Sequence, residues 1–121
     1  RKSGARVTLT TAGDSAEISL PVKIALYRLI QESLANGFRH GGSSHQRVDV
    51  SNADDQLNVT VSDNGVGFDP RSMTTDGHVG LEGMQERVEI LGGSFHLHSR
   101  PGHGTVITVS LPMHLAGIEY E

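Results

Sequence analysis

The sequence predicts an α+β fold, namely a two-layer α/β sandwich with a mixed sheet of about five strands and helices on one face. Three observations lead to this class. Short runs alternate apolar and polar residues, as half-buried strands do, and two longer stretches space their apolar residues as amphipathic helices do. The elements follow one another in the order β-α-β-β-loop-α-β-β, and a length of 121 residues suits one domain with one core.

The first strand is expected at residues 5–10, where the alternation is regular. Proline suits the first turn of a helix and glycine commonly ends one, so a long helix is expected at residues 21–40, from Pro21 to just before Gly41. We expect its core-facing stripe to consist of Val22, Leu26, Ile30 and Ser33, with Leu34 beyond them.

Two hairpins are expected, because two pairs of alternating runs are each separated by a short polar or glycine-rich turn. The first hairpin joins residues 47–51 to residues 56–62. The second joins residues 94–99 to residues 105–111.

Between the hairpins we expect a loop at residues 68–79 and a second helix at residues 80–91. The loop has no periodicity, and a loop of this length inside a compact domain is often functional. The apolar face of the helix is expected to consist of Leu81, Met84, Val88 and Leu91. Residues 113–121 are expected to form a surface tail.

Composition narrows the function classes. The formal net charge is −4 and no basic face dominates, which argues against nucleic acid as a partner. Without cysteine, the chain has no disulfide and no thiolate metal site. No apolar run is long enough to span a membrane, and no signal-peptide pattern is present. Because the chain begins at Arg1 without a methionine, we expect it to be part of a longer protein.

Polar side chains gather at the end of the long helix. At about 100° of turn per residue, Glu32, Asn36, Arg39 and His40 fall on one contiguous arc. A carboxamide oxygen is a hard ligand that suits magnesium, and a cation one turn further along can meet a phosphate. The alternative is an ordinary solvated helix face, and this stretch alone does not decide between the two.

Three glycine-containing stretches follow along the chain. Residues 63–67 come directly after a strand, where glycine lets the backbone approach a ligand and the Asp63 carboxylate can accept a purine amino group. Residues 77–84 place glycines at a loop-to-helix junction, where exposed N–H groups form an anion site. Residues 102–105 connect two strands. Taken singly, each stretch is more simply interpreted as a turn, a helix entry or a hairpin loop.

Together and in this order, the four stretches resemble the ATP-binding domain of sensor histidine kinases. That domain belongs to a group that includes DNA gyrase, mismatch-repair ATPases and a heat-shock chaperone. The resemblance covers residues 20–111, with residues 31–40 similar to the asparagine box and the three later stretches similar to the glycine boxes. Two of these motifs are most similar to those of kinases that signal to helix-turn-helix response regulators. Their sequences here are Gln-Glu-Ser-Leu-Ala-Asn and Gly-Leu-Glu-Gly-Met-Gln-Glu-Arg.

The resemblance implies how the nucleotide base and the metal would be bound. Asp63 would accept a hydrogen bond from the adenine amino group, and Thr105 would support that contact directly or through water. Gly65 and Gly67 would keep the floor of the pocket open. Asn36 would hold the magnesium ion that bridges the ATP phosphates.

The resemblance also implies roles around the phosphates. Arg39 and His40 would lie near them, as would the N–H groups of Gly80 and Leu81 at the start of the second helix. Residues 68–79 would be the ATP lid. Glu32 would be the catalytic residue. It would activate water, as in the hydrolysing relatives, or polarise the attacking histidine, as in a kinase. The resemblance leaves both roles open.

The function that the resemblance implies is the catalytic ATP-binding domain of a two-component histidine kinase. It would bind ATP and Mg²⁺ and donate the γ-phosphoryl group to a histidine on a dimerisation domain upstream in the same protein, which would serve a response regulator. We expect the isolated domain to be monomeric and cytoplasmic, with a parent that can sit in the bacterial inner membrane. Two rivals share the scaffold: a serine kinase acting on an anti-sigma-factor antagonist, and a non-catalytic nucleotide-sensing module.

A separate metal site is a weaker hypothesis. His96 and His98 point to one face of a strand, and such a pair can share a metal ion. The sequence offers no third ligand in register, so solvated histidines are the simpler interpretation.

Overall fold

The computed structural model describes residues 6–12, 18–41, 45–67 and 81–114, with the backbone alone described for 6–12 and 37–41. The elements in chain order are β1 (Arg6–Ala12), α1 (Leu20–Gly41), β2 (His45–Ala53), β3 (Gln56–Asp63), α2 (Leu81–Ile90), β4 (Ser94–Ser99) and β5 (Thr105–Pro112). All expected strands and both expected helices are present, and their ends differ from the expected ones by at most two residues. The expected lid and most of the expected tail lie outside the described residues.

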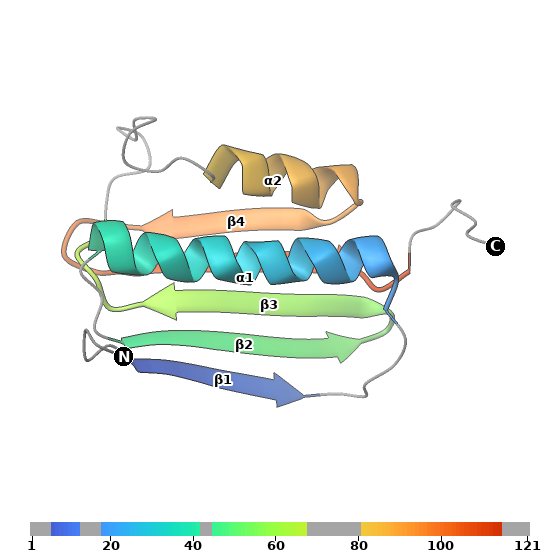
Figure 1. The fold of residues 1–121 in the computed structure, drawn as a ribbon, viewed down its shortest axis with the longest axis horizontal. Coiled ribbons are helices and arrows are strands. Elements are labelled where there is room, and N and C mark those ends of the chain that lie inside the picture. The colour runs from blue at the N-terminus through green and yellow to red at the C-terminus, as the bar shows by residue number, and fades with distance from the viewer. Residues whose placement is uncertain (1–5, 13–17, 42–44, 68–80, 115–121) are drawn as a thin grey trace.

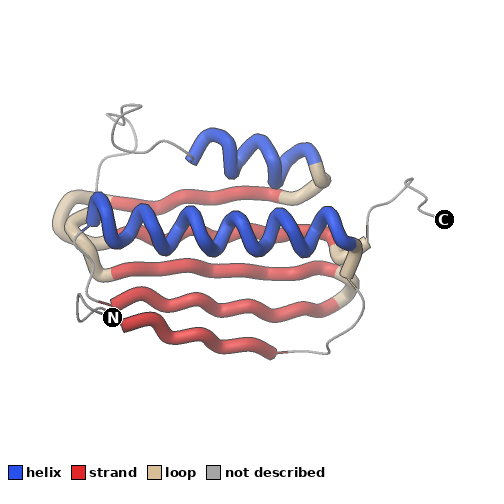
Figure 2. Tube along the Cα trace, in the orientation of Figure 1, coloured by secondary structure: helices blue, strands red, loops and turns tan. Residues whose placement is uncertain are grey.

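The strands form one sheet in the order β1-β2-β3-β5-β4. β1 runs parallel to β2, whereas the other neighbouring pairs are antiparallel, so the sheet is mixed as the sequence predicted. Both helices lie on the same face of this sheet (Figures 1 and 2). The described residues therefore form the expected two-layer sandwich.

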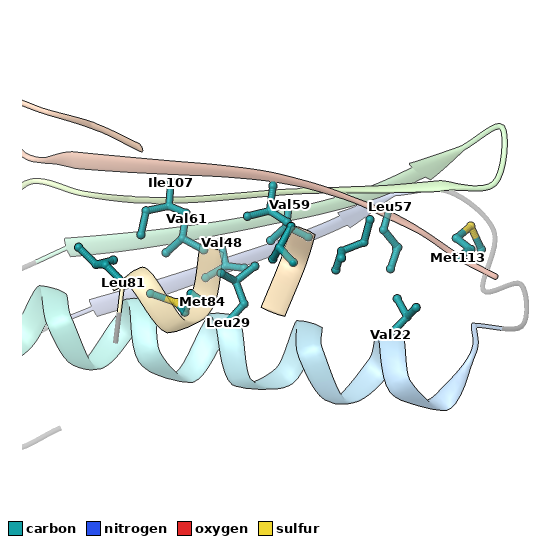
Figure 3. Packing of buried hydrophobic residues seen from close by; sticks show 13 residues of the cluster. Val22, Leu29, Val48, Leu57, Val59, Val61, Leu81, Met84, Ile107 and Met113 are labelled. Atoms are coloured by element: carbon teal, nitrogen blue, oxygen red, sulfur yellow. The ribbon is translucent and has the colours of Figure 1, made fainter. Parts of the chain in front are cut away.

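The core fills the space between the helices and the inner face of the sheet (Figure 3). Alternate residues of the strands point inward, because side chains alternate between the two faces of a sheet. The buried apolar cluster consists of Val22, Leu29, Val48, Leu57, Val59, Val61, Leu81, Met84, Val88, Ile107, Val109, Leu111 and Met113.

The buried stripe of α1 differs from the expected one. Val22 and Ser33 are buried as expected, but the stripe between them runs through Ala25 and Leu29. The other expected members are only partly buried, namely Leu26, Ile30 and Leu34. The physical reason is that α1 packs against α2 as well as the sheet, with Ser33 Oγ lying 3.9 Å from Met84 Sδ.

Met113 corrects the expected start of the surface tail. Its side chain is 3% exposed and belongs to the core. Its backbone N–H donates to the Asp55 carbonyl at 2.8 Å, and its carbonyl accepts the N–H of Ser19 at 2.9 Å. Ser19 precedes α1, so these bonds hold the end of β5 under the start of that helix.

Four segments that the sequence analysis singled out reach the same end of the molecule. The C-terminal end of α1, the end of β3 and the turn between β4 and β5 lie at the left in Figure 1, and α2 begins on the same side, nearer the middle of the view. Within the described part of the chain, no helix is both long and apolar enough to cross a membrane.

Candidate functional site

A row of four polar side chains crosses the sheet at this end. Asp63 on β3 is paired with Gln46 on β2 and with Thr105 on β5, and Thr105 is paired in turn with Ser99 on β4. All four are in phase with the buried positions of their strands, so they point toward the helices. The inner face therefore changes from apolar to polar in its last row.

The Asp63 carboxylate is held in one orientation by its own turn. Its Oδ1 accepts the backbone N–H of Gly65 at 2.8 Å, the bond that aspartate commonly makes two residues along in a turn. An ionised carboxylate has acceptor sites on both oxygens, so it can still accept bonds from a ligand. Gly65 was expected to keep the pocket floor open, and in the structure its N–H orients the carboxylate.

Two glycine stretches pack backbone against backbone beside Asp63. Gly67 has a φ of +69°, and a Cβ there would lie 2.1 Å from the Arg100 carbonyl oxygen. Gly104 has a φ of +76°, and a Cβ there would lie 2.2 Å from the Asp63 carbonyl oxygen. Only glycine fits either position, because other residues disfavour this φ and the added atom would overlap backbone.

The β4–β5 turn places a hydroxyl pair beside this glycine contact. Ser99 Oγ donates to the Gly104 carbonyl at 3.0 Å and lies 2.8 Å from Thr105 Oγ1. Sequence reasoning predicted Thr105 but missed Ser99. The available signal was its place at a strand end in phase with Phe95 and Leu97, which face the core.

Gln46 joins the sheet to α1 near Asn36. Its side chain is 0% exposed, and its Nε2 donates to the Leu34 carbonyl at 3.1 Å. Its Oε1 is also buried and has no hydrogen-bond partner among the described residues. Because Gln46 also pairs with Asp63, it connects the helix that carries Asn36 with the strand that carries Asp63. Sequence reasoning missed this residue, although a glutamine two positions before the buried Val48 was a signal.

Glu32 and Asn36 are both half-buried on α1. Asn36 Nδ2 is enclosed by protein. Glu32 lines a hollow of about 660 Å³ between the two helices, together with Arg28 and Arg87. Glu32 therefore lies on the side of α1 that faces this hollow, which we call the groove between α1 and α2, one turn before Asn36.

The remaining predicted site residues are described only in part. Arg39 and His40 belong to the last turns of α1, but their side chains are outside the described set, as is Gly80 altogether. Leu81 is the first residue of α2, and its side chain is 4% exposed in the core. Only its backbone N–H is therefore available to a ligand, at a helix terminus where such groups have no partner within the helix.

His96 and His98 are exposed on β4, on the face opposite the helices, as expected for solvated histidines. Across the residues that the structure describes, no group of three or more histidine, cysteine, aspartate or glutamate side chains is placed to hold a metal ion.

Comparisons with known sequences identify the family of this chain. Residues 22–115 match the family described as histidine kinase-, DNA gyrase B- and HSP90-like ATPase. The chain is 40% identical over 92 residues to the signal transduction histidine-protein kinase/phosphatase DegS of Brevibacillus brevis, covering 76% of this chain and 24% of that protein. It is 36% identical over 105 residues to an uncharacterised sensor-like histidine kinase of Chloroflexus aurantiacus, covering 83% of this chain and 18% of that protein. The chain thus spans about a quarter or less of these relatives.

Solved structures share the fold. The ATP-binding domain of PrrB from Mycobacterium tuberculosis superposes with a TM-score of 0.72 at 20% identity, covering 92% of this chain and 82% of that one. The histidine kinase domain of the blue-light activated kinase EL346 from Erythrobacter litoralis superposes with a TM-score of 0.67 at 22% identity, covering 88% of this chain and 52% of that one.

Proposed function

Because this chain belongs to the family of histidine kinase-, DNA gyrase B- and HSP90-like ATPases, as an ATP-binding domain of the histidine-kinase type, we propose that it donates the γ-phosphoryl group of ATP to a histidine. The acceptor lies on a separate dimerisation domain of the parent protein. The parent protein then passes the phosphoryl group to a response regulator of the helix-turn-helix type. The sequences of the asparagine box and the second glycine box favour this type of response regulator.

Asp63 binds the adenine base in this proposal. Its carboxylate, oriented by the Gly65 N–H at 2.8 Å, accepts a hydrogen bond from the exocyclic amino group. Guanine carries an oxygen at that position, which has no proton to donate. Thr105, directly opposite Asp63 on β5, supports the contact. The close backbone approach at Gly67 and Gly104 keeps this end of the pocket free of side chains that would displace the base.

The phosphates then extend toward the ends of the helices. Asn36, with the buried amide nitrogen facing protein, offers a hard oxygen of the kind Mg²⁺ prefers. When bound, Mg²⁺ supplies positive charge that neutralises the phosphates. Arg39, His40 and the N–H groups of Gly80 and Leu81 provide further positive character on the phosphate side, with residues 68–79 as the lid.

Glu32 is the proposed catalytic residue. It faces the groove between α1 and α2 rather than the adenine end, which suits a group that meets the incoming acceptor. We assign it the kinase role, in which its carboxylate accepts a hydrogen bond from the attacking imidazole and raises the nucleophilicity of the opposite ring nitrogen.

The observation that carries the proposal is the inward-facing Asp63 carboxylate, which is held by the Gly65 N–H and lies directly opposite Thr105. Isothermal titration of the chain with ATP and Mg²⁺ tests it. We expect wild type to bind with very little turnover, because the acceptor histidine is supplied by another domain. Asp63→Ala is expected to abolish binding. The matched control is Asp49→Ala, because Asp49 lies out of phase with the inward-facing positions of β2 and pairs with Arg47 at 3.0 Å.

Asn36→Ala is expected to remove the Mg²⁺ dependence of binding while leaving the base contact intact. Absence of ATP binding by wild type would refute the proposal, as would retained affinity in Asp63→Ala.

A further inference from the structure

We propose that Ser99 is a positioning residue that turns the hydroxyl proton of Thr105 away from the nucleotide, so that the pocket offers only acceptors to the 6-position of a purine. The proposal rests on the proposed function, in which Asp63 and Thr105 meet the base. It adds a residue that determines base specificity without touching the base.

The direction of the Thr105 proton follows from the hydrogen bonds. A serine hydroxyl has one proton to donate. Ser99 Oγ is bonded to the Gly104 carbonyl at 3.0 Å, and a carbonyl can only accept, so the Ser99 proton is used there. Either hydroxyl can be the donor in the 2.8 Å contact between Ser99 Oγ and Thr105 Oγ1, and the arrangement that makes both bonds at once has Thr105 as the donor. In that arrangement, the single proton of Thr105 is committed to Ser99.

The backbone makes this arrangement rigid. Gly104 is buried, has a φ of +76°, and leaves no room for a Cβ beside the Asp63 carbonyl oxygen. Its carbonyl is therefore a fixed acceptor for Ser99. Since Ser99 and Thr105 are directly paired across β4 and β5, their side chains start from adjacent positions on the same face of the sheet.

Asp63 and Thr105 consequently present lone pairs to the same region. They are directly opposite on neighbouring strands, where Cβ atoms lie about 5 Å apart. The 6-amino group of adenine has two protons and satisfies both oxygens, directly or through water. A purine with a 6-oxo group has an acceptor there, and that oxygen would face the Thr105 lone pairs without a proton between them.

Hypoxanthine isolates this effect from other differences between bases. It differs from adenine only in carrying a 6-oxo group and a proton on N1. The N1 proton can be donated to Asp63, which leaves the 6-oxo group as the unsatisfied atom beside Thr105. A Thr105 hydroxyl released from Ser99 would rotate and donate to that oxygen. Ser99 thus disfavours a 6-oxo purine, because it keeps the Thr105 hydroxyl from donating to the 6-oxo group. The specificity comes from an unfavourable contact with the wrong base.

The test compares the dissociation constants of ATP and inosine triphosphate at fixed Mg²⁺. In Ser99→Ala, we expect the preference for ATP over inosine triphosphate to fall about tenfold, since leaving an acceptor without a donor typically costs on that order. Ser99→Thr and Ser99→Val form a matched pair of nearly equal shape that differs in the hydroxyl. The preference should persist in Ser99→Thr and fall in Ser99→Val.

A background substitution separates this role from a structural one. In Thr105→Val, no hydroxyl remains to be oriented, so adding Ser99→Ala should leave the ratio of the two constants unchanged. Equal weakening of both nucleotides by Ser99→Ala and Ser99→Val would overturn the proposal, as would a change of ratio in the Thr105→Val background. Failure of wild type to bind ATP would instead overturn the proposed function.

Discussion

Replacing Gly104 by alanine is expected to destabilise the domain much more than the same replacement at Gly102. The two glycines lie in one turn, with φ values of +76° and +83°. A Cβ at Gly102 would meet nothing within 4 Å, whereas a Cβ at Gly104 would lie 2.2 Å from the Asp63 carbonyl oxygen. The pair therefore separates backbone strain from steric overlap.

The magnitudes follow from these two terms. Alanine in the left-handed region costs roughly 1–2 kcal/mol, and the lower conformational entropy of the unfolded alanine variant offsets part of this cost. The free energy of unfolding should therefore fall by about 1 kcal/mol in Gly102→Ala. Gly104→Ala adds an overlap of the kind that costs about 1–3 kcal/mol in packed interiors, giving a loss of about 3 kcal/mol. ATP affinity should also fall at least about tenfold in Gly104→Ala, because the backbone of Asp63 must move.

Urea unfolding of both variants measures the difference in the free energy of unfolding. The midpoint of thermal unfolding should fall by about 4 °C for each kcal/mol lost in a domain of this size. Equal losses in the two variants would show that the close approach between Gly104 and Asp63 does not exist in solution.

Three further expectations follow. Gly83→Ala should raise the free energy of unfolding by about 1 kcal/mol, as measured by urea titration. A Cβ at this position meets nothing within 4 Å, and alanine has a higher helix propensity than glycine. A loss of stability would contradict the geometry of α2. Gln46→Ala should lower the free energy of unfolding by about 2 kcal/mol, because it leaves a cavity. Gln46→Leu should stay within about 1 kcal/mol of wild type, because it fills the space and removes the buried Oε1, which has no hydrogen-bond partner among the described residues. Glu32→Gln should slow labelled phosphoryl transfer to a supplied dimerisation domain about 100-fold at unchanged ATP affinity, and an unchanged rate would exclude the carboxylate from catalysis.

The fold was predictable because its signals are local. The alternation at residues 56–62 and the helical spacing from Leu81 to Val88 both survive in the structure with almost unchanged ends. Predictions went wrong where a distant element decides burial. The stripe of α1 includes Ala25 and Leu29 because the helix packs against both the sheet and α2, and Met113 is buried because its backbone bonds to Ser19 and Asp55.

The sequence indicated some residues of the candidate site and missed others. The order of the asparagine and glycine stretches indicated a nucleotide pocket, and the structure brings Asp63 and Thr105 together in one cross-strand pair. Gln46 and Ser99 were missed, because a polar residue in an inward strand position has no meaning until its partners are known. The roles assigned to Glu32 and Asn36 stay predictions.

The sequence by itself determined the strands, the helices and the residue types available for chemistry, because periodicity and glycine placement act over a few neighbouring residues. Only the tertiary structure decided that Gln46, Asp63, Thr105 and Ser99 share one row, since that row depends on the register of four strands. Register is set by the packing of the whole inner face against two helices. The contact between the Ser99 and Thr105 hydroxyls at 2.8 Å depends on the same register and on no local pattern.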